Sequence, residues 1–115
     1  MTAPTIDINA FRELQDTAGP EFAAELVDTF LEEAPLMLAE LRRARAASNA
    51  DTFRRAAHSL KSNSQTFGAM ALGALARDLE LTGFAAAPEH DTAAFDALDA
   101  AYAQVAVALK ALCHG

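Results

Sequence analysis

Apolar residues recur along the chain at intervals of three and four residues, the spacing that places side chains on one face of an α-helix. Turn-forming residues interrupt this pattern and divide it into five helical segments. The first segment is short, can be capped by Asp7 or Asn9, and stops near Gly19. We therefore expect an all-α fold, an up-down-up-down four-helix bundle with a short additional N-terminal helix as a lid, forming one domain over residues 1–115.

Prolines, glycines and acidic residues mark the predicted helix ends. Pro20 suits the first turn of the second helix, whereas Pro35 in its middle predicts a kink or a break. Asp51 can cap the third helix and Gly68 closes it. The fourth helix ends near Gly83, and Asp91 can cap the last helix after a loop over residues 84–90.

Large apolar residues at helical spacing are expected to form the core. Phe67 and Met70 belong to this group. Leu14, Phe22 and Met37 can instead remain exposed as a docking patch, but core positions are favoured for each.

Composition narrows the class of protein further. Hydrophobic residues make up 52% of the 115, many of them alanine, which favours close-packed helices. The net charge of −7 argues against nucleic-acid binding, and no apolar run approaches the roughly 18 residues needed for membrane insertion. Cys113 has no intramolecular partner and no leader resembles a signal peptide, so we expect a cytoplasmic location.

The third predicted helix carries the residues with the clearest chemical potential. Its apolar stripe follows Phe53, Ala57, Leu60, Ser64 and Phe67. A different face of the same helix gathers polar side chains, and this places an imidazole toward solvent or a partner. These polar residues are His58, Lys61, Ser62 and Gln65.

An exposed histidine beside cations suits transient chemistry with an anion. Arg54 and Arg55 lie one turn before His58, and Lys61 lies one turn after it. Neutral imidazole is available near pH 7 and is able to form covalent intermediates, of which a phosphoryl adduct is one. An isolated surface histidine usually has no such role, and either arginine alone is as consistent with solubility as with docking.

The surrounding residues favour the functional interpretation. The run Ala-His-Ser-Leu-Lys over 57–61, small polar residues after it, and Gly68-Ala69 opening a helix that ends in Leu79-Glu80 resemble the histidine-containing phosphotransfer (HPt) family. The resemblance extends over nearly the whole chain. It implies a phosphorelay carrier that accepts a phosphoryl group from a receiver-domain aspartate and passes it to another receiver domain.

The resemblance also implies roles for individual residues. His58 would be the phosphoacceptor, through its outer ring nitrogen, and Lys61 would stabilise the phosphoryl group. Ser62 and Gln65 would complete the phosphoryl environment, because a hydroxyl and an amide can donate hydrogen bonds to phosphoryl oxygens. Possible partner-docking positions are Arg54, Arg55, Gly68 and Glu80.

Two positions leave alternatives open. The family usually has glycine after the lysine, and Ser62 there either contacts the phosphoryl group or slows receiver docking. Glu80 stands where some family members carry a glutamine that helps to orient the histidine, but a solvated residue at a helix end is equally consistent with the sequence.

The implied partners are the receiver domain of a response regulator or of a hybrid sensor histidine kinase. The chain would bind no cofactor, Mg²⁺ would belong to the receiver, and we expect a monomer. No Gly-rich phosphate loop indicates a kinase. The alternative is a docking or scaffold module that never carries phosphate.

A metal-binding bundle is remote because no Glu-x-x-His pair occurs, and the run Glu89-His90-Asp91 fits a solvated turn better than a metal site. His114 and Cys113, near the C-terminus, are treated as incidental.

Overall fold

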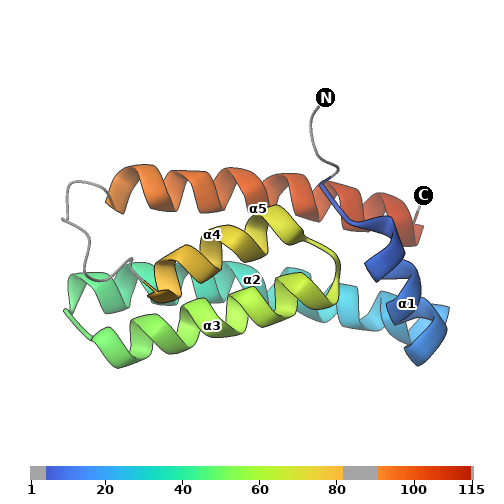
Figure 1. Ribbon diagram of the computed structural model, residues 1–115, viewed down its shortest axis with the longest axis horizontal. Coiled ribbons are helices and arrows are strands. Elements are labelled where there is room, and N and C mark those ends of the chain that lie inside the picture. The colour runs from blue at the N-terminus through green and yellow to red at the C-terminus, as the bar shows by residue number, and fades with distance from the viewer. Residues whose placement is uncertain (1–4, 82–90, 115) are drawn as a thin grey trace.

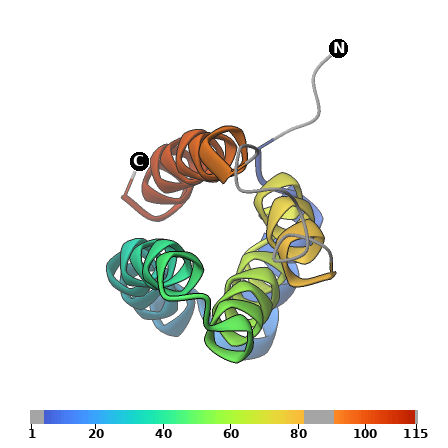
Figure 2. The ribbon, with the colours of Figure 1, turned by 90° about the vertical axis from the view of Figure 1, so that its left-hand side faces the viewer.

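A computed structural model describes residues 5–81 and 91–114, and every regular element within them is an α-helix. The helices are α1 (Ile8–Ala18), α2 (Pro20–Ala46), α3 (Ala50–Thr66), α4 (Met70–Leu81) and α5 (Asp91–His114). Helices α2 to α5 run alternately up and down (Figure 1), and seen from one end they surround a common core (Figure 2). The predicted fold class, an up-down-up-down bundle with a short additional N-terminal helix, is confirmed.

Helix α1 lies at the end of the bundle where α3 turns into α4 (Figure 1) and contacts both α2 and α3. Asp7 caps it, accepting hydrogen bonds from the backbone N–H groups of Asn9 and Ala10. The backbone N–H of Asp7 also donates to the carbonyl of Gly68, at 2.7 Å. This bond ties the start of α1 to the α3–α4 turn, and Phe11, almost fully buried, adds apolar contact below it.

Gly68 has a conformation that only glycine adopts without strain here. Its φ is +79°, and a Cβ at this position would lie 2.6 Å from the backbone oxygen of Asp7. The residue is buried. Gly68 therefore allows both the tight turn and the close approach of α1, which gives it a structural role; its possible docking role stays a prediction.

The break predicted at Pro35 does not occur, because α2 continues from Pro20 to Ala46. Proline has no N–H, so within the helix Pro35 cannot donate to the carbonyl of Leu31, four residues earlier. The hydroxyl of Tyr102 on α5 donates to this same carbonyl oxygen at 3.0 Å. A neighbouring helix thus supplies the donor that the proline lacks.

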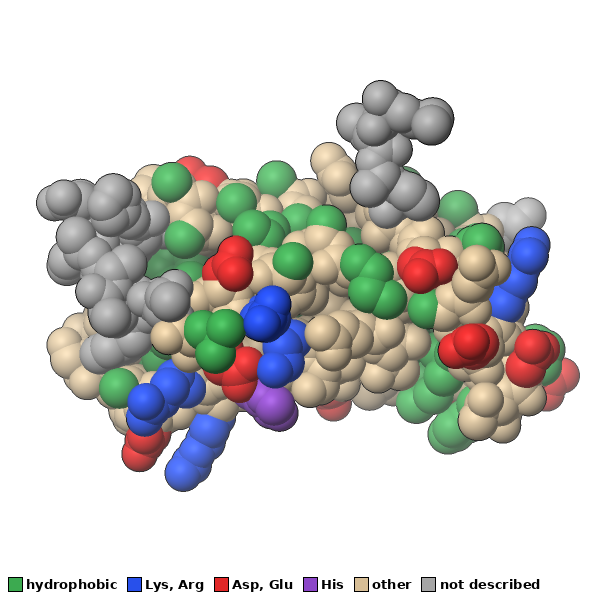
Figure 3. Space-filling model, viewed as in Figure 1, with side chains coloured by type: hydrophobic (Ala, Val, Ile, Leu, Met, Phe, Trp, Pro, Cys, Tyr) green, Lys and Arg blue, Asp and Glu red, His purple; other side chains and the backbone are tan. Residues whose placement is uncertain are grey.

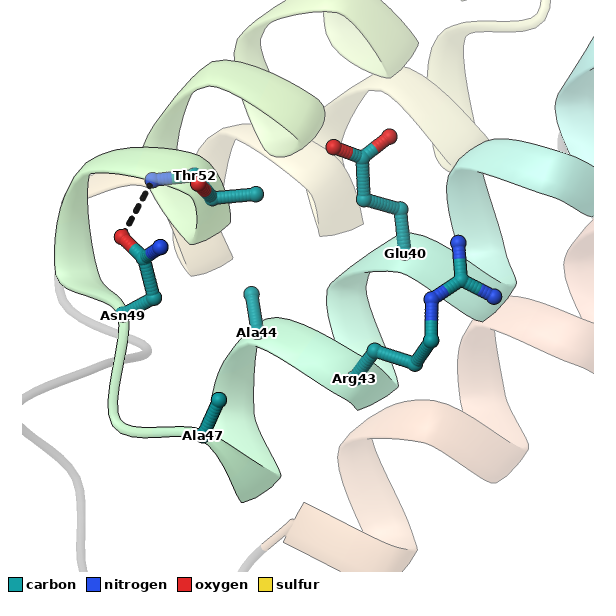
Figure 4. Close-up of a pocket in the computed structure, with 6 residues that line it drawn as sticks. All are labelled: Glu40, Arg43, Ala44, Ala47, Asn49 and Thr52. Carbon is teal, nitrogen blue, oxygen red and sulfur yellow. Dashed lines mark hydrogen bonds between the residues drawn. The ribbon is translucent and has the colours of Figure 1, made fainter.

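The start of α3 also differs from expectation. Asn49, not Asp51, is the N-cap, and its side-chain oxygen accepts a hydrogen bond from the backbone N–H of Thr52 at 3.1 Å. The turn before it is tight, with Ser48 at φ +55°, and the helix begins at Ala50, two residues earlier than an Asp51 cap requires. Asp51 lies in the first helical turn and forms an ion pair with Arg54. An open pocket at this α2–α3 junction (Figure 4) is lined by Asn49 and Thr52, the two residues that the cap bond joins.

Two of the residues expected in the core are instead exposed. Met70, at the start of α4, is 45% exposed, and Phe22, near the start of α2, is 52% exposed. Each lies in the first turns of its helix, where the neighbouring helices do not cover the side chain. Leu14 and Met37 are partly buried against the core, as favoured, and Phe67 is buried. The predicted helix end at Gly83 and the predicted loop over 84–90 lie outside the described residues. The side chain of Asp91, the predicted cap of the last helix, is not described either.

Candidate functional site

Helix α3 separates buried and exposed residues as its sequence predicts. Phe53, Ala57, Leu60, Ser64 and Phe67 are all buried. Ser64 is polar, but its hydroxyl donates to the carbonyl of Leu60 at 2.6 Å, so its burial leaves no unpaired group. The stripe holds α3 in a fixed rotation and directs its opposite face toward solvent.

The imidazole of His58 lies on that open face, with 58% of its side chain exposed. Figure 3 shows a histidine at the surface, next to basic and acidic side chains. An open pocket beside it is lined by Arg54, Arg55, Ser59 and Glu80 as well as by the ring itself. The sequence prediction that His58 is reachable from solvent is confirmed.

Helix α4 brings a carboxylate to this ring. Glu80 Oε2 lies 2.6 Å from His58 Nδ1, and Glu80 Oε1 accepts a hydrogen bond from Lys61 Nζ at 2.8 Å. One carboxylate therefore engages both residues that the sequence singled out. The side chains of Glu80 and Lys61 are each only 20% exposed, so this pairing is largely shielded from water.

Close packing of α3 on α4 makes these contacts possible. A Cβ at Gly73 would lie 3.5 Å from the side chains of both Ser64 and Gln65. Small residues on the two facing surfaces, Ser64 on α3 and Gly73 on α4, allow the helix axes to approach closely. Since α4 is close to α3 along its length, a side chain near its end reaches the middle of α3.

The carboxylate is ionised at neutral pH. Its hydrogen bond with Lys61 is the largest cause that lowers the pKa of Glu80 below the ordinary 4.5; partial burial opposes this, and the His58 contact adds to the lowering. An ionised carboxylate only accepts hydrogen bonds, so Nδ1 of a neutral His58 must carry the proton that it shares with Glu80. The tautomer assigned in this way leaves the lone pair on Nε2.

Four other expected site residues lie along α3, and two of them, Arg54 and Arg55, line the same pocket as His58. Ser62 and Gln65 are exposed, one and two turns after the histidine. Arg54 pairs with Asp51 at 2.8 Å. Arg55 forms no ion pair within the described part of the chain, so its charge is open to a partner.

The sequence was equally consistent with a role for Glu80 at the site and with a solvated residue at a helix end. The structure shows Glu80 at the centre of the site. A signal was present in the spacing. Glu80 follows Gly68 by twelve residues and His58 precedes it by ten, so two antiparallel helices joined at Gly68 bring the two close together. The spacing does not predict the rotation of α4 about its own axis, because that rotation is set by the packing of α4 against its neighbours.

Metal-ligand clusters and long apolar helices were two further features to look for in the described residues. Within residues 5–81 and 91–113, no three potential metal ligands come together. His90 and the side chain of His114 lie outside the description, and Cys113 is partly buried, with a pKa raised by burial and by the charge of Asp28. No described helix is both long enough and apolar enough to cross a bilayer.

Comparison with known proteins agrees with this geometry. The sequence matches the Hpt domain family over residues 25–114, most of the chain. The chain therefore belongs to the Hpt domain family, whose members carry out histidine phosphotransfer in two-component phosphorelays and interact with receiver domains and kinases.

The fold is also that of a solved relative. The crystal structure of histidine-containing phosphotransfer protein B (HptB) from Pseudomonas aeruginosa PAO1 matches with a TM-score of 0.86 and 26% sequence identity, covering 97% of this chain and 96% of that one. A comparison with curated protein sequences gave no match.

Proposed function

We propose that this protein is a phosphorelay carrier in which Nε2 of His58 accepts a phosphoryl group from a receiver-domain aspartate and passes it to the aspartate of another receiver. One observation carries the proposal. The ring is exposed, and its Nδ1 is held by Glu80 at 2.6 Å, which leaves Nε2 as the nucleophile on a rigid helix.

In the first half of the reaction, the Nε2 lone pair of His58 attacks phosphorus and the bond from phosphorus to the aspartyl oxygen breaks. Its electron pair returns to the receiver's carboxylate. The second half reverses these steps on another receiver. In this proposal Mg²⁺ belongs to the receiver, where it would neutralise charge on the phosphoryl oxygens.

The remaining residues of the open face have supporting roles in this proposal. Lys61 would keep one ammonium N–H on Glu80 and direct another at the phosphoryl oxygens, a charge-assisted contact that Ser62 and Gln65 extend with hydrogen bonds. Arg54 and Arg55 would meet the acidic surroundings of the receiver's aspartate. We further propose that the chain acts as a single domain over residues 1–115, as a monomer, and as a carrier and not a kinase. The cytoplasmic location stays a prediction.

Transfer of a radioactive phosphoryl group tests the proposal. The protein is mixed with phosphorylated receiver domains and Mg²⁺, and acid-labile label on the carrier is followed in time. We expect label on the wild type and none on His58→Gln, with unchanged helical circular dichroism. A wild type that binds receivers across a broad panel but never takes up label contradicts the proposal and supports the scaffold alternative.

The same assay separates the cation of the site from an ordinary surface cation. We expect Lys61→Ala to slow phosphorylation about tenfold, since it loses one partly shielded charge contact with the phosphoryl group. Arg42→Ala is the matched control, because Arg42 also pairs with a carboxylate at 2.8 Å but joins α2 to α5. Equal rates for the two variants would show that Lys61 does not assist transfer, and loss of the helical circular-dichroism signal in Lys61→Ala would show that the lysine is structural.

A further inference from the structure

Glu80 contacts Nδ1 of His58, the ring nitrogen that does not react in the proposed transfer. From this position Glu80 can also act on the ring after phosphorylation. Its Oε2 lies 2.6 Å from Nδ1 of His58, whereas its Oε1 is anchored by Lys61 at 2.8 Å. The anchored carboxylate cannot easily turn away when the electronic state of the ring changes. It is therefore still beside Nδ1 when a phosphoryl group is on Nε2.

Phosphorylation changes the charge of the ring. The neutral imidazole carries one proton, on Nδ1, and gives its Nε2 lone pair to phosphorus. The product is an imidazolium with a proton on Nδ1 and phosphorus on Nε2, so the ring bears a positive charge. This acidic N–H points at an ionised carboxylate, a charge-assisted hydrogen bond that stabilises the protonated ring.

We infer that Glu80 keeps Nδ1 of the phosphorylated His58 protonated, so that the ring leaves as neutral imidazole even in alkaline solution. The inference rests on the proposed phosphocarrier function and assigns a positioning residue within it. When a receiver carboxylate attacks phosphorus, the P–N bond breaks and its electron pair returns to Nε2. The ring is then neutral and still carries its Nδ1 proton, so no proton has to be moved in either transfer. A ring that had lost this proton would have to leave as an imidazolate anion, a much poorer leaving group.

The other charged groups around the ring act against Glu80. Arg54, Arg55 and Lys61 on α3 are cations near the ring and disfavour a positive ring, and Glu80 on α4 is the one anion that lines the described pocket. Described residues of α1 and α2 do not line it. Removing the charge of Glu80 therefore leaves no anion in the lining of this pocket except the phosphoryl group itself, since Asp51, which pairs with Arg54, does not line it.

The test compares wild type with Glu80→Gln, which keeps an oxygen able to accept the Nδ1 hydrogen bond but has no charge. Both proteins are loaded with phosphoramidate, a small chemical phosphoryl donor, so that loading needs no receiver. Nitrogen-15 NMR of the phosphorylated ring then reports the protonation of Nδ1 from pH 6 to pH 10. We expect Nδ1 to lose its proton at a lower pH in Glu80→Gln than in the wild type.

Transfer to one receiver domain is measured over the same pH range, and the ratio of the two rates cancels the pH dependence of the receiver. A separation of about one pH unit makes the wild type up to about tenfold faster than Glu80→Gln at alkaline pH, with little difference near pH 6. Asp99→Asn is the matched control, because it also removes the charge of a paired carboxylate, 2.8 Å from Arg42, but on the α2–α5 face, so the Nδ1 titration and the transfer rates should not change.

Parallel rate profiles, or identical Nδ1 titrations in wild type and Glu80→Gln, would overturn the inference. A wild type that accepts no phosphoryl group from either donor would instead refute the proposed function, so the two failures are distinguishable.

Discussion

Two faces of the bundle join helices through charged side chains, but they do so differently. On the α2–α5 face, Arg42 pairs with Asp99 at 2.8 Å and its guanidinium lies 5.2 Å from the ring centroid of Phe95. On the α3–α4 face, Glu80 divides its two oxygens between a lysine and a histidine. The first arrangement pairs one cation with one anion; the second leaves a reactive ring held at one nitrogen and open at the other.

The difference shows how a helical bundle separates stability from chemistry. Roughly half of each side chain in the Arg42–Asp99 pair is in contact with water, so this pair adds little more than local order. Glu80 and Lys61 are far less exposed, and they restrict the orientation of a ring that itself remains accessible. Restriction of the partners and exposure of the nucleophile are together what a transfer site requires.

The largest effect should come from disrupting the turn that positions α4. Gly68→Ala places a Cβ 2.6 Å from the Asp7 backbone at a positive φ, and we expect a loss of about 3 kcal/mol in the free energy of unfolding, measured by urea denaturation. Gly19→Ala is the control: it also has a positive φ, but no atom lies within 4 Å of its Cβ. Equal losses for both variants would mean that strain alone matters and that the α1 contact does not.

An intermediate effect is expected on the α2–α5 face. Tyr102→Phe keeps an aromatic ring against Phe30 but removes the donor to the Leu31 carbonyl, so unfolding should become easier by about 1 kcal/mol. In a Pro35→Ala background, residue 35 regains its N–H and donates to that carbonyl. The cost of Tyr102→Phe should then shrink, and a cost of the same size in both backgrounds would refute the proposed compensation.

The smallest expected effect is a pH dependence of the folding stability that Glu80 contributes on the α3–α4 face. Because the pKa of Glu80 is lowered in the folded protein, chiefly by Lys61, its ionised form stabilises the fold above its ordinary pKa of 4.5. This contribution should be lost as the pH falls below 4.5 and through the folded-state pKa. The urea midpoints of wild type and Glu80→Gln should therefore differ at pH 7 and converge once the pH is below the folded-state pKa of Glu80. A constant separation would show that the charge of Glu80 does not stabilise the fold.

Several local features of this protein were determined by its sequence alone. The spacing of Phe53, Leu60 and Phe67 was enough to direct His58 outward, because helical periodicity fixes which residues share a face. Asp7 as a cap and Pro20 in a first turn followed from backbone hydrogen bonding, which is local.

Other features were decided by contacts between helices that are distant in sequence. Pro35 is tolerated because Tyr102, 67 residues later, donates to the carbonyl that the proline leaves free. Met70 and Phe22 are exposed because no neighbouring helix covers their positions, which periodicity cannot reveal. Glu80 joins the site because small residues at the α3–α4 interface bring α4 close and packing sets its rotation. Such features depend on how whole helices pack, and no local pattern of residues encodes that.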